Sequence, residues 1–266
     1  MAKTHISGIA LPEIYAAETI GTMYRALSLP EETVGAVRQY FSAASHLYGI
    51  VPLKHLLHIY NEQNPPISEE EFLAVADVVC HEDNDFCILE MNDLYEEASV
   101  AEPLDREVVS LLILSLGLDR YYDLANAQAG KPYALLPRDR FLAYLDPGYY
   151  PKTSENVNMI AFLRKHSVCL HQPARDVLRS IQSMIWLGME EQEVMRCLGT
   201  VGFRFQNHAD RRVFRVLFHA MARHTRTIAN RGETPAVAGG HSSLSLAAHR
   251  RWAARLMSAA RKYIIR

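Results

Sequence analysis

The sequence predicts a mainly α-helical protein of two parts, with a winged-helix-like module and a small β-hairpin near the N-terminus. Apolar residues recur at helical spacing along most of the 266 residues, and a single short strand-forming run, FCILEM, follows a polar turn. The charge also changes sign along the chain. Residues 1–159 contain 24 acidic and 10 basic residues, and residues 160–266 contain 6 acidic and 18 basic residues. Net charges of −14 and +12 indicate that the two parts meet different partners, or each other.

Four helices are predicted over residues 12–80. The first covers about 12–27, and the second runs from Glu31 to Gly49 after Ser28, a residue typical of helix N-caps. The third is a short helix that begins after Pro52. The fourth follows the Asn-Pro-Pro break at 64–66, where Ser68 precedes Glu71 by three residues in the pattern of a capping box, and ends near Cys80.

A strand or hairpin is predicted around 86–95, because FCILEM is too short for a helix and rich in strand formers. Helix, short extended piece, two helices and hairpin is the order of a winged helix, over 29–95. A plain bundle of three amphipathic helices would give nearly the same pattern. The following segment, Val108 to Leu118, is apolar almost all round and predicts a buried helix that is far too short to span a bilayer.

Turn and loop residues separate the two parts. Gly-Lys-Pro at 130–132 predicts a turn, 138–145 a short helix and 146–152 a loop, so the sequence predicts an acidic domain over 1–150 and a basic one over 151–266. In the second part we expect a Gly-, Pro- and Ser-rich loop over 230–244 and four helices, which cover 173–188, 190–198, 209–227 and 245–264.

The strongest candidate for a functional site is the basic surface of the C-terminal helices. Sixteen of the 18 basic residues after position 159 are arginines, whose planar guanidinium matches phosphate or carboxylate oxygens two at a time. The candidate binding residues are Arg211, Arg212, Arg215, Arg223, Arg226, Arg250, Arg251 and Arg255. A solvated helix face, or a contact with the acidic part of the same chain, would give the same pattern.

The acidic part argues against DNA binding by the winged-helix-like module. The helix that would enter the groove contains Glu69, Glu70, Glu71 and Asp77, which phosphates would repel. This module is therefore expected to bind protein, and its acidity could also mimic nucleic acid toward a basic partner.

No catalytic or metal-binding motif stands out, and no cofactor is predicted. His55 and His58 lie three residues apart, but no further ligand is spaced convincingly beside them. The four cysteines contain no CxxC pair and are expected to be reduced. There is no GxSxG, P-loop, HExxH or GxGxxG motif. Their absence lowers the case for an enzyme but does not remove it.

Three segments resemble bacterial helical proteins that commonly end in a SEC-C zinc-binding tail: LYGIVPLKHLLHIYNEQNPPISEEEF (47–72), GKPYALLPRDRFLAYLDPGYYPKT (130–153) and TRTIANRGETP (225–235). The resemblance implies a bacterial cytoplasmic protein with an interaction role. Where the cysteine-rich tail would follow, residues 239–266 contain no cysteine. Zinc is therefore not carried over, and the basic last helix is expected to take the tail's binding role.

Together these features predict a non-enzymatic intracellular binding protein. Its acidic half would contact protein, and its Arg-rich half an acidic partner. DNA or RNA binding by the basic helices, self-association through the opposed charges, and an enzyme with scattered active-site residues remain alternatives. A membrane protein is not expected, because nowhere do 18 apolar residues run together.

Overall fold

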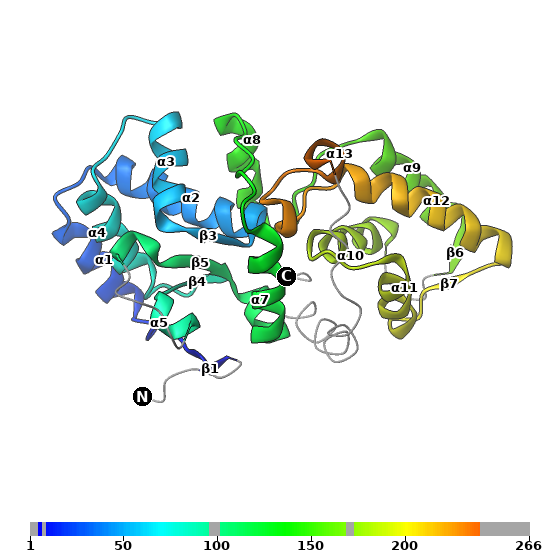
Figure 1. Ribbon diagram of the computed structural model, residues 1–266, viewed down its shortest axis with the longest axis horizontal. Coiled ribbons are helices and arrows are strands. Elements are labelled where there is room, and N and C mark those ends of the chain that lie inside the picture. The colour runs from blue at the N-terminus through cyan, green and yellow to red at the C-terminus, as the bar shows by residue number, and fades with distance from the viewer. Residues whose placement is uncertain (1–4, 7–8, 96–101, 169–172, 240–266) are drawn as a thin grey trace. The chain divides into compact units, whose positions relative to one another are not determined.

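The computed structural model describes residues 5–6, 9–95, 102–168 and 173–239 (Figure 1). Within these ranges the chain is mainly helical, and its largest sheet is antiparallel with three strands, so the predicted fold class is confirmed. The chain divides into two compact units. Unit 1 combines residues 1–121 with 135–147, and unit 2 combines residues 122–134 with 148–266.

Unit 1 contains most of the strands. Its helices are α1 (Ala17–Ala26), α2 (Glu31–Tyr48), α3 (Leu53–Gln63), α4 (Glu69–Val79), α5 (Met91–Leu94), α6 (Leu111–Leu116) and α8 (Arg138–Leu142), with 3-10 turns at Pro103–Asp105 and Ala143–Leu145. Its strands are β1 (His5–Ile6), β2 (Ile9–Ala10), β3 (Ile50–Pro52), β4 (Phe86–Leu89) and β5 (Glu107–Ser110). Helix α7 (Leu118–Gln128) begins in unit 1 and ends in unit 2.

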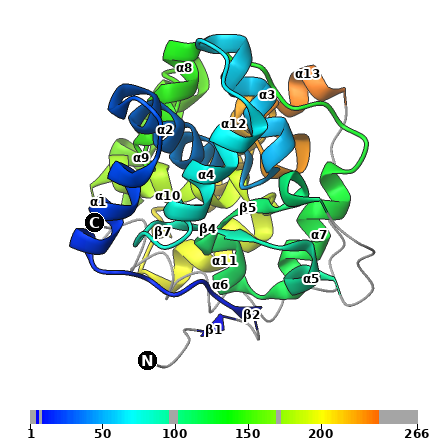
Figure 2. The same ribbon diagram turned by 90° about the vertical axis from the view of Figure 1, so that its left-hand side faces the viewer.

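The central part of unit 1 contains the three-stranded sheet and the helices around it. Elements α2, β3, α3, α4 and β4 follow one another, and β5, which comes later in the chain, lies between β3 and β4 in the sheet. Val109 of β5 stands opposite Ile50 on one side and Cys87 on the other. Figures 1 and 2 show α2 and α3 on one side of this sheet and β1 on the other. The connection from β4 to β5 contains α5 and a 3-10 turn instead of a tight hairpin turn.

Helix α2 forms the core of this unit. It packs against α3, α4, α8, β3 and β5, and Phe41 stacks on Phe72 of α4 with ring centroids 5.2 Å apart. The helix ends at Gly49, whose positive φ of 71° is accessible to glycine at little cost, and the chain turns directly into β3. The predicted capping box is confirmed at α4: Ser68 Oγ accepts from the Glu71 N–H, and the Glu71 carboxylate accepts from the Ser68 N–H.

Three local predictions in unit 1 are wrong. The run from Val108 begins as the buried strand β5 and becomes helix α6 only at Leu111, because a continuous apolar run is equally compatible with a buried strand. A strand or hairpin was predicted around 86–95, but only 86–89 is a strand. The residues after Glu90 form helix α5, because Glu90 and Asp93 make a capping box. Ser28 does not cap α2, whose N-cap is Pro30 and has no side-chain hydrogen bond.

Unit 2 is mainly helical, and α12 with 17 residues is its longest described helix. Its elements are α9 (Ser154–His166), β6 (Ser167–Val168), α10 (Ala174–Trp186), α11 (Glu191–Thr200), β7 (Arg204–Phe205), α12 (His208–His224), a 3-10 turn at Ile228–Asn230 and α13 (Pro235–Ala238). The predictions for α10, α11 and α12 agree with these bounds. Helix α9 was not predicted, because its apolar residues do not follow one helical face: Val157 is exposed, whereas Met159 and Phe162 are buried. The predicted helix over 245–264 lies outside the described residues.

Candidate partner-binding surface

Helix α12 is positioned by an N-cap and a buried aromatic face. Asn207 Oδ1 accepts a hydrogen bond of 2.9 Å from the Asp210 N–H, which fixes the start of the helix. Phe214 and Phe218 are buried, and Phe214 contacts the ring of Phe162 on α9. The opposite face of α12 is therefore turned to solvent.

Four of the predicted arginines lie on that solvent face. Arg211, Arg212, Arg215 and Arg223 are exposed. Arg212, Arg215, His219 and Arg223 follow one another at spacings of three, four and four residues, which places them along a single line on the helix. We call these four residues the basic line; at a rise of 1.5 Å per residue it is about 16 Å long.

Two of the predicted arginines are engaged inside unit 2. Arg215 Nε donates to Glu191 Oε2 at 2.8 Å, and His219 Nε2 lies 3.6 Å from the same oxygen. Arg226 follows the helix, is half-buried and donates to the Gly232 carbonyl at 2.7 Å. These contacts give Arg215 and Arg226 structural roles within the unit.

The remaining predicted arginines fall into two groups. Arg211, Arg212 and Arg223 have no carboxylate partner within the part of the chain that the structure describes. Arg250, Arg251 and Arg255 lie outside the described residues. Within the described residues, the arginines without a carboxylate partner therefore lie near the two ends of α12.

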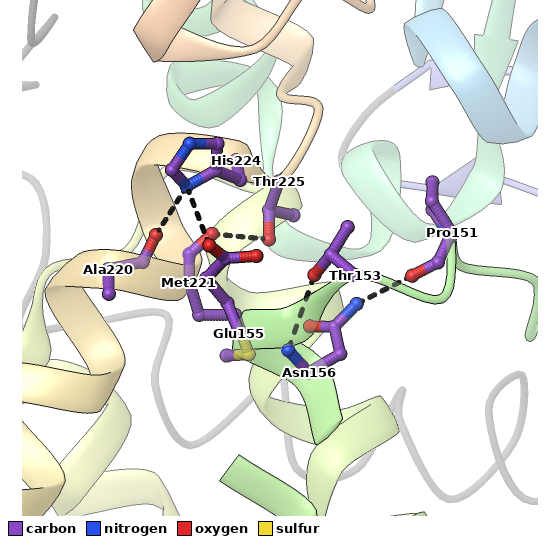
Figure 3. Close-up of polar contacts among 8 residues, drawn as sticks. All are labelled: Pro151, Thr153, Glu155, Asn156, Ala220, Met221, His224 and Thr225. Atoms are coloured by element: carbon purple, nitrogen blue, oxygen red, sulfur yellow. Dashed lines mark hydrogen bonds and ion pairs between the residues drawn. The ribbon is translucent and has the colours of Figure 1, made fainter. Parts of the chain in front are cut away.

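Helix α9 runs antiparallel to α12 and is held at both ends. His166 Nδ1 lies 3.0 Å from Asp210 Oδ1 at the start of α12, and His224 Nδ1 lies 3.7 Å from Glu155 Oε1 at its end. Figure 3 shows the second pair, with His224 and Glu155 pointing toward one another from the two helices. These two contacts link α9 and α12 at both ends, so the two helices present one continuous surface.

Asn156 fixes the first turn of α9. Its N–H donates to Thr153 Oγ1 at 3.3 Å, and its side-chain Nδ2 donates to the Pro151 carbonyl at 2.7 Å (Figure 3). These two bonds join the helix to the loop before it. The side chain of Asn156 is buried, and its bonds keep the start of α9 in place.

Three further basic residues join this surface that the sequence did not single out. Arg164 and Lys165 are exposed in the last turn of α9, next to His166 and therefore close to the start of α12. Arg204 is exposed on β7, paired with Val168 just beyond α9. The antiparallel packing brings these residues to the end of α12 that carries Arg211 and Arg212. The sequence did not indicate that Arg164 and Lys165 belong to this surface, because helix α9 was not predicted.

The two units differ strongly in charge. The described residues of unit 1 contain 20 acidic and 7 basic residues, and those of unit 2 contain 8 acidic and 14 basic residues. Glu69, Glu70 and Asp77 are exposed on α4, although Asp77 pairs with Arg106 at 2.7 Å. The charge division seen in the sequence therefore persists when each unit is considered by itself.

Within the described residues, no cluster of three or more His, Cys, Asp or Glu side chains could hold a metal ion. A surface pocket in unit 1 is lined by Asp77, Glu90, Glu102 and Arg106, among others. Its carboxylates have structural partners: Asp77 pairs with Arg106, and Glu90 and Glu102 belong to capping boxes. This pocket therefore offers no free acid and base pair.

Comparison with protein-family models, curated proteins and solved structures finds no match. The resemblance to SEC-C-associated proteins stays a prediction. No helix in the described ranges is both long and apolar enough to cross a bilayer.

Proposed function

We propose that this chain is a non-enzymatic binding protein whose unit 2 binds an acidic macromolecular partner through α12. The observation that carries the proposal is the basic line, in which Arg212 and Arg223 are exposed and have no carboxylate partner in the described ranges. The planar fork of each guanidinium can meet carboxylate or phosphate oxygens two at a time. The resemblance to SEC-C-associated proteins supports an interaction role and a cytoplasmic location.

Unit 1 is proposed to contact a different partner. In a winged-helix arrangement α4 is the helix that would read a DNA groove, yet it exposes Glu69 and Glu70. Phosphates would repel this helix, so a protein surface with basic residues is the better match.

The proposal for unit 2 is tested by comparing two double variants of the full chain. Arg212→Ala/Arg223→Ala removes two charges from the basic line. Arg175→Ala/Arg196→Ala removes two exposed charges of the same type from α10 and α11 in the same unit. The probes are fluorescein-labelled poly-glutamate and a 20-base-pair DNA duplex, and binding is followed by fluorescence anisotropy from 50 to 300 mM NaCl.

We expect the first variant to raise the Kd about tenfold, since two exposed charge contacts contribute about 1.4 kcal/mol together, and the second to change it less than about twofold. The Kd of the unchanged protein should rise with salt. Binding that is absent, or equally weakened by both variants, would refute the proposed role of α12.

A second candidate function is nucleic-acid binding, which one observation favours. Arg164, Lys165 and Arg204 lie at the same end of the α9–α12 pair as Arg211 and Arg212, and several cations at one end can together neutralise several phosphates. This candidate requires the DNA duplex to bind more tightly than poly-glutamate, with log Kd rising linearly with log salt concentration. Equal or weaker binding of the duplex would remove it.

A further inference from the structure

The solvent face of α12 has an apolar side as well as a basic one. Val213 is 47 % exposed and Val216 is 69 % exposed, so both present apolar surface to solvent in the middle of the helix. Single exposed valines need no explanation, but a row of them beside a functional candidate does.

Helical spacing aligns the apolar residues. Ala209, Val213, Val216 and Ala220 follow one another at spacings of four, three and four residues, and so lie along a single line parallel to the basic line. We call these four residues the apolar line. Its two valines and Ala220 each come one residue after a member of the basic line, which is about a quarter of a turn around the helix.

The neighbouring helices fix which side each line faces. Arg215 of the basic line contacts Glu191 of α11, whereas Asp210 and His224, which flank the apolar line on its other side, contact α9. Going around α12, the order is therefore α11, basic line, apolar line and α9. On the α9 side, the exposed Lys165 directly precedes His166, which contacts Asp210 of α12.

We propose that this surface is a docking site for an acidic amphipathic helix of a partner protein. The apolar face of that helix would cover Val213 and Val216, and its carboxylates would meet Arg212 and Arg223 on one side and Lys165 on the other. An amphipathic helix presents apolar residues at positions i, i+3, i+4 and i+7, which matches a straight apolar line about three helical turns long. This inference rests on the proposed function and specifies the partner of the same surface.

Two other occupants match the surface less well. Residues 240–266 of this chain contain six basic and no acidic residues, so like charges would keep that segment away from the basic line. A nucleic acid would satisfy the arginines through its phosphates but would leave the valines without an apolar partner. The apolar line is therefore the feature that distinguishes a protein helix from a polyanion.

The experiment uses the full chain and two labelled 18-residue peptides of identical composition. One peptide has Leu at helical a and d spacing with Glu at most other positions, and the other is a scrambled version without an apolar face. We expect the amphipathic peptide to bind at least tenfold more tightly than the scrambled one at 150 mM NaCl, measured by anisotropy.

Alanine variants then separate the two lines. Val213→Ala/Val216→Ala should weaken the amphipathic peptide about five- to tenfold and leave the scrambled peptide unchanged, because alanine preserves the helix but removes apolar contact area. Ile14→Ala, which alters a residue 49 % exposed in unit 1, is the control and should change neither affinity. Circular dichroism, which reports on the helices of both units, confirms that each variant is folded.

Each remaining outcome overturns the inference in a recognisable way. Equal binding of both peptides would mean that the apolar line plays no part, while the proposed binding of acidic partners would stand. If neither peptide and no other acidic probe binds, both the inference and the proposed function fail. Tighter binding of the 20-base-pair duplex, lost with Arg212→Ala/Arg223→Ala but not with the valine variant, would assign the surface to nucleic acid.

Discussion

The arginines of α12 should differ in what they contribute to stability. Arg215 Nε lies 2.8 Å from Glu191 Oε2, and the Glu191 side chain is only 9 % exposed. A hydrogen bond between charged groups contributes about 1.5–3 kcal/mol when shielded from water, and the 56 % exposure of Arg215 brings this down toward its lower limit. Arg215→Ala should therefore cost about 1–1.5 kcal/mol. Arg212→Ala, on the same helix but without a carboxylate partner in the described ranges, should cost less than about 0.5 kcal/mol.

Urea unfolding followed by tryptophan fluorescence measures this difference. Both tryptophans, Trp186 and Trp252, lie in the second half of the chain, so the signal reports on unit 2. A double-mutant cycle with Glu191→Gln should give a coupling energy of about 1 kcal/mol for the pair. If Arg215→Ala and Arg212→Ala unfold at the same urea midpoint, the contact with Glu191 does not stabilise the unit and the division into structural and binding arginines is wrong.

Three further outcomes are expected in unit 1. Burial lowers the pKa of His46, but the hydrogen bond and the charge of Asp85, 2.5 Å away, outweigh it and leave the pKa raised. The stabilisation is therefore complete at low pH and is lost as pH rises through the folded-state pKa, so His46→Gln should destabilise more at pH 5 than at pH 9, as measured by urea unfolding with circular dichroism. An equal cost at both pH values would contradict this. Ser68→Ala removes the oxygen that accepts from the Glu71 N–H and should cost about 1 kcal/mol in the same assay, whereas an unchanged midpoint would show that the capping box is dispensable. Burial raises the pKa of the Cys87 thiol to about 12, so iodoacetamide at pH 8 should label it only after denaturation; rapid labelling of the native protein, detected by peptide mass mapping, would disagree.

The fold was predictable where local chemistry is decisive. Helix α4 was correctly placed from Ser68 and Glu71, because a capping box is complete within four residues. The end of helix α2 at Gly49 was also predicted correctly, because a glycine after the last turn is a local signal for a helix end. Strand β5 was not predicted, since the apolar run at Val108 acquires its conformation from the strands on either side of it.

The candidate surface was predictable only in part. The spacing of Arg212, Arg215 and Arg223 already places them on one face of a helix. That Arg215 is engaged by Glu191 depends on how α11 packs against α12, and no feature of the sequence indicates that contact. Exposed Val216 was not singled out either, because an apolar residue in an amphipathic helix is first assigned to the core.

By itself the sequence determined the helical class, the opposite charges of the two halves and the arginine face of α12, because each of these depends on composition or on spacing within one element. Only the tertiary structure decided that α9 joins α12 and brings Arg164 and Arg204 to the same end. It also decided that Val213 and Val216 are exposed beside the basic line. Neighbours in space are set by packing between distant segments, and local spacing carries no information about which distant segment will arrive.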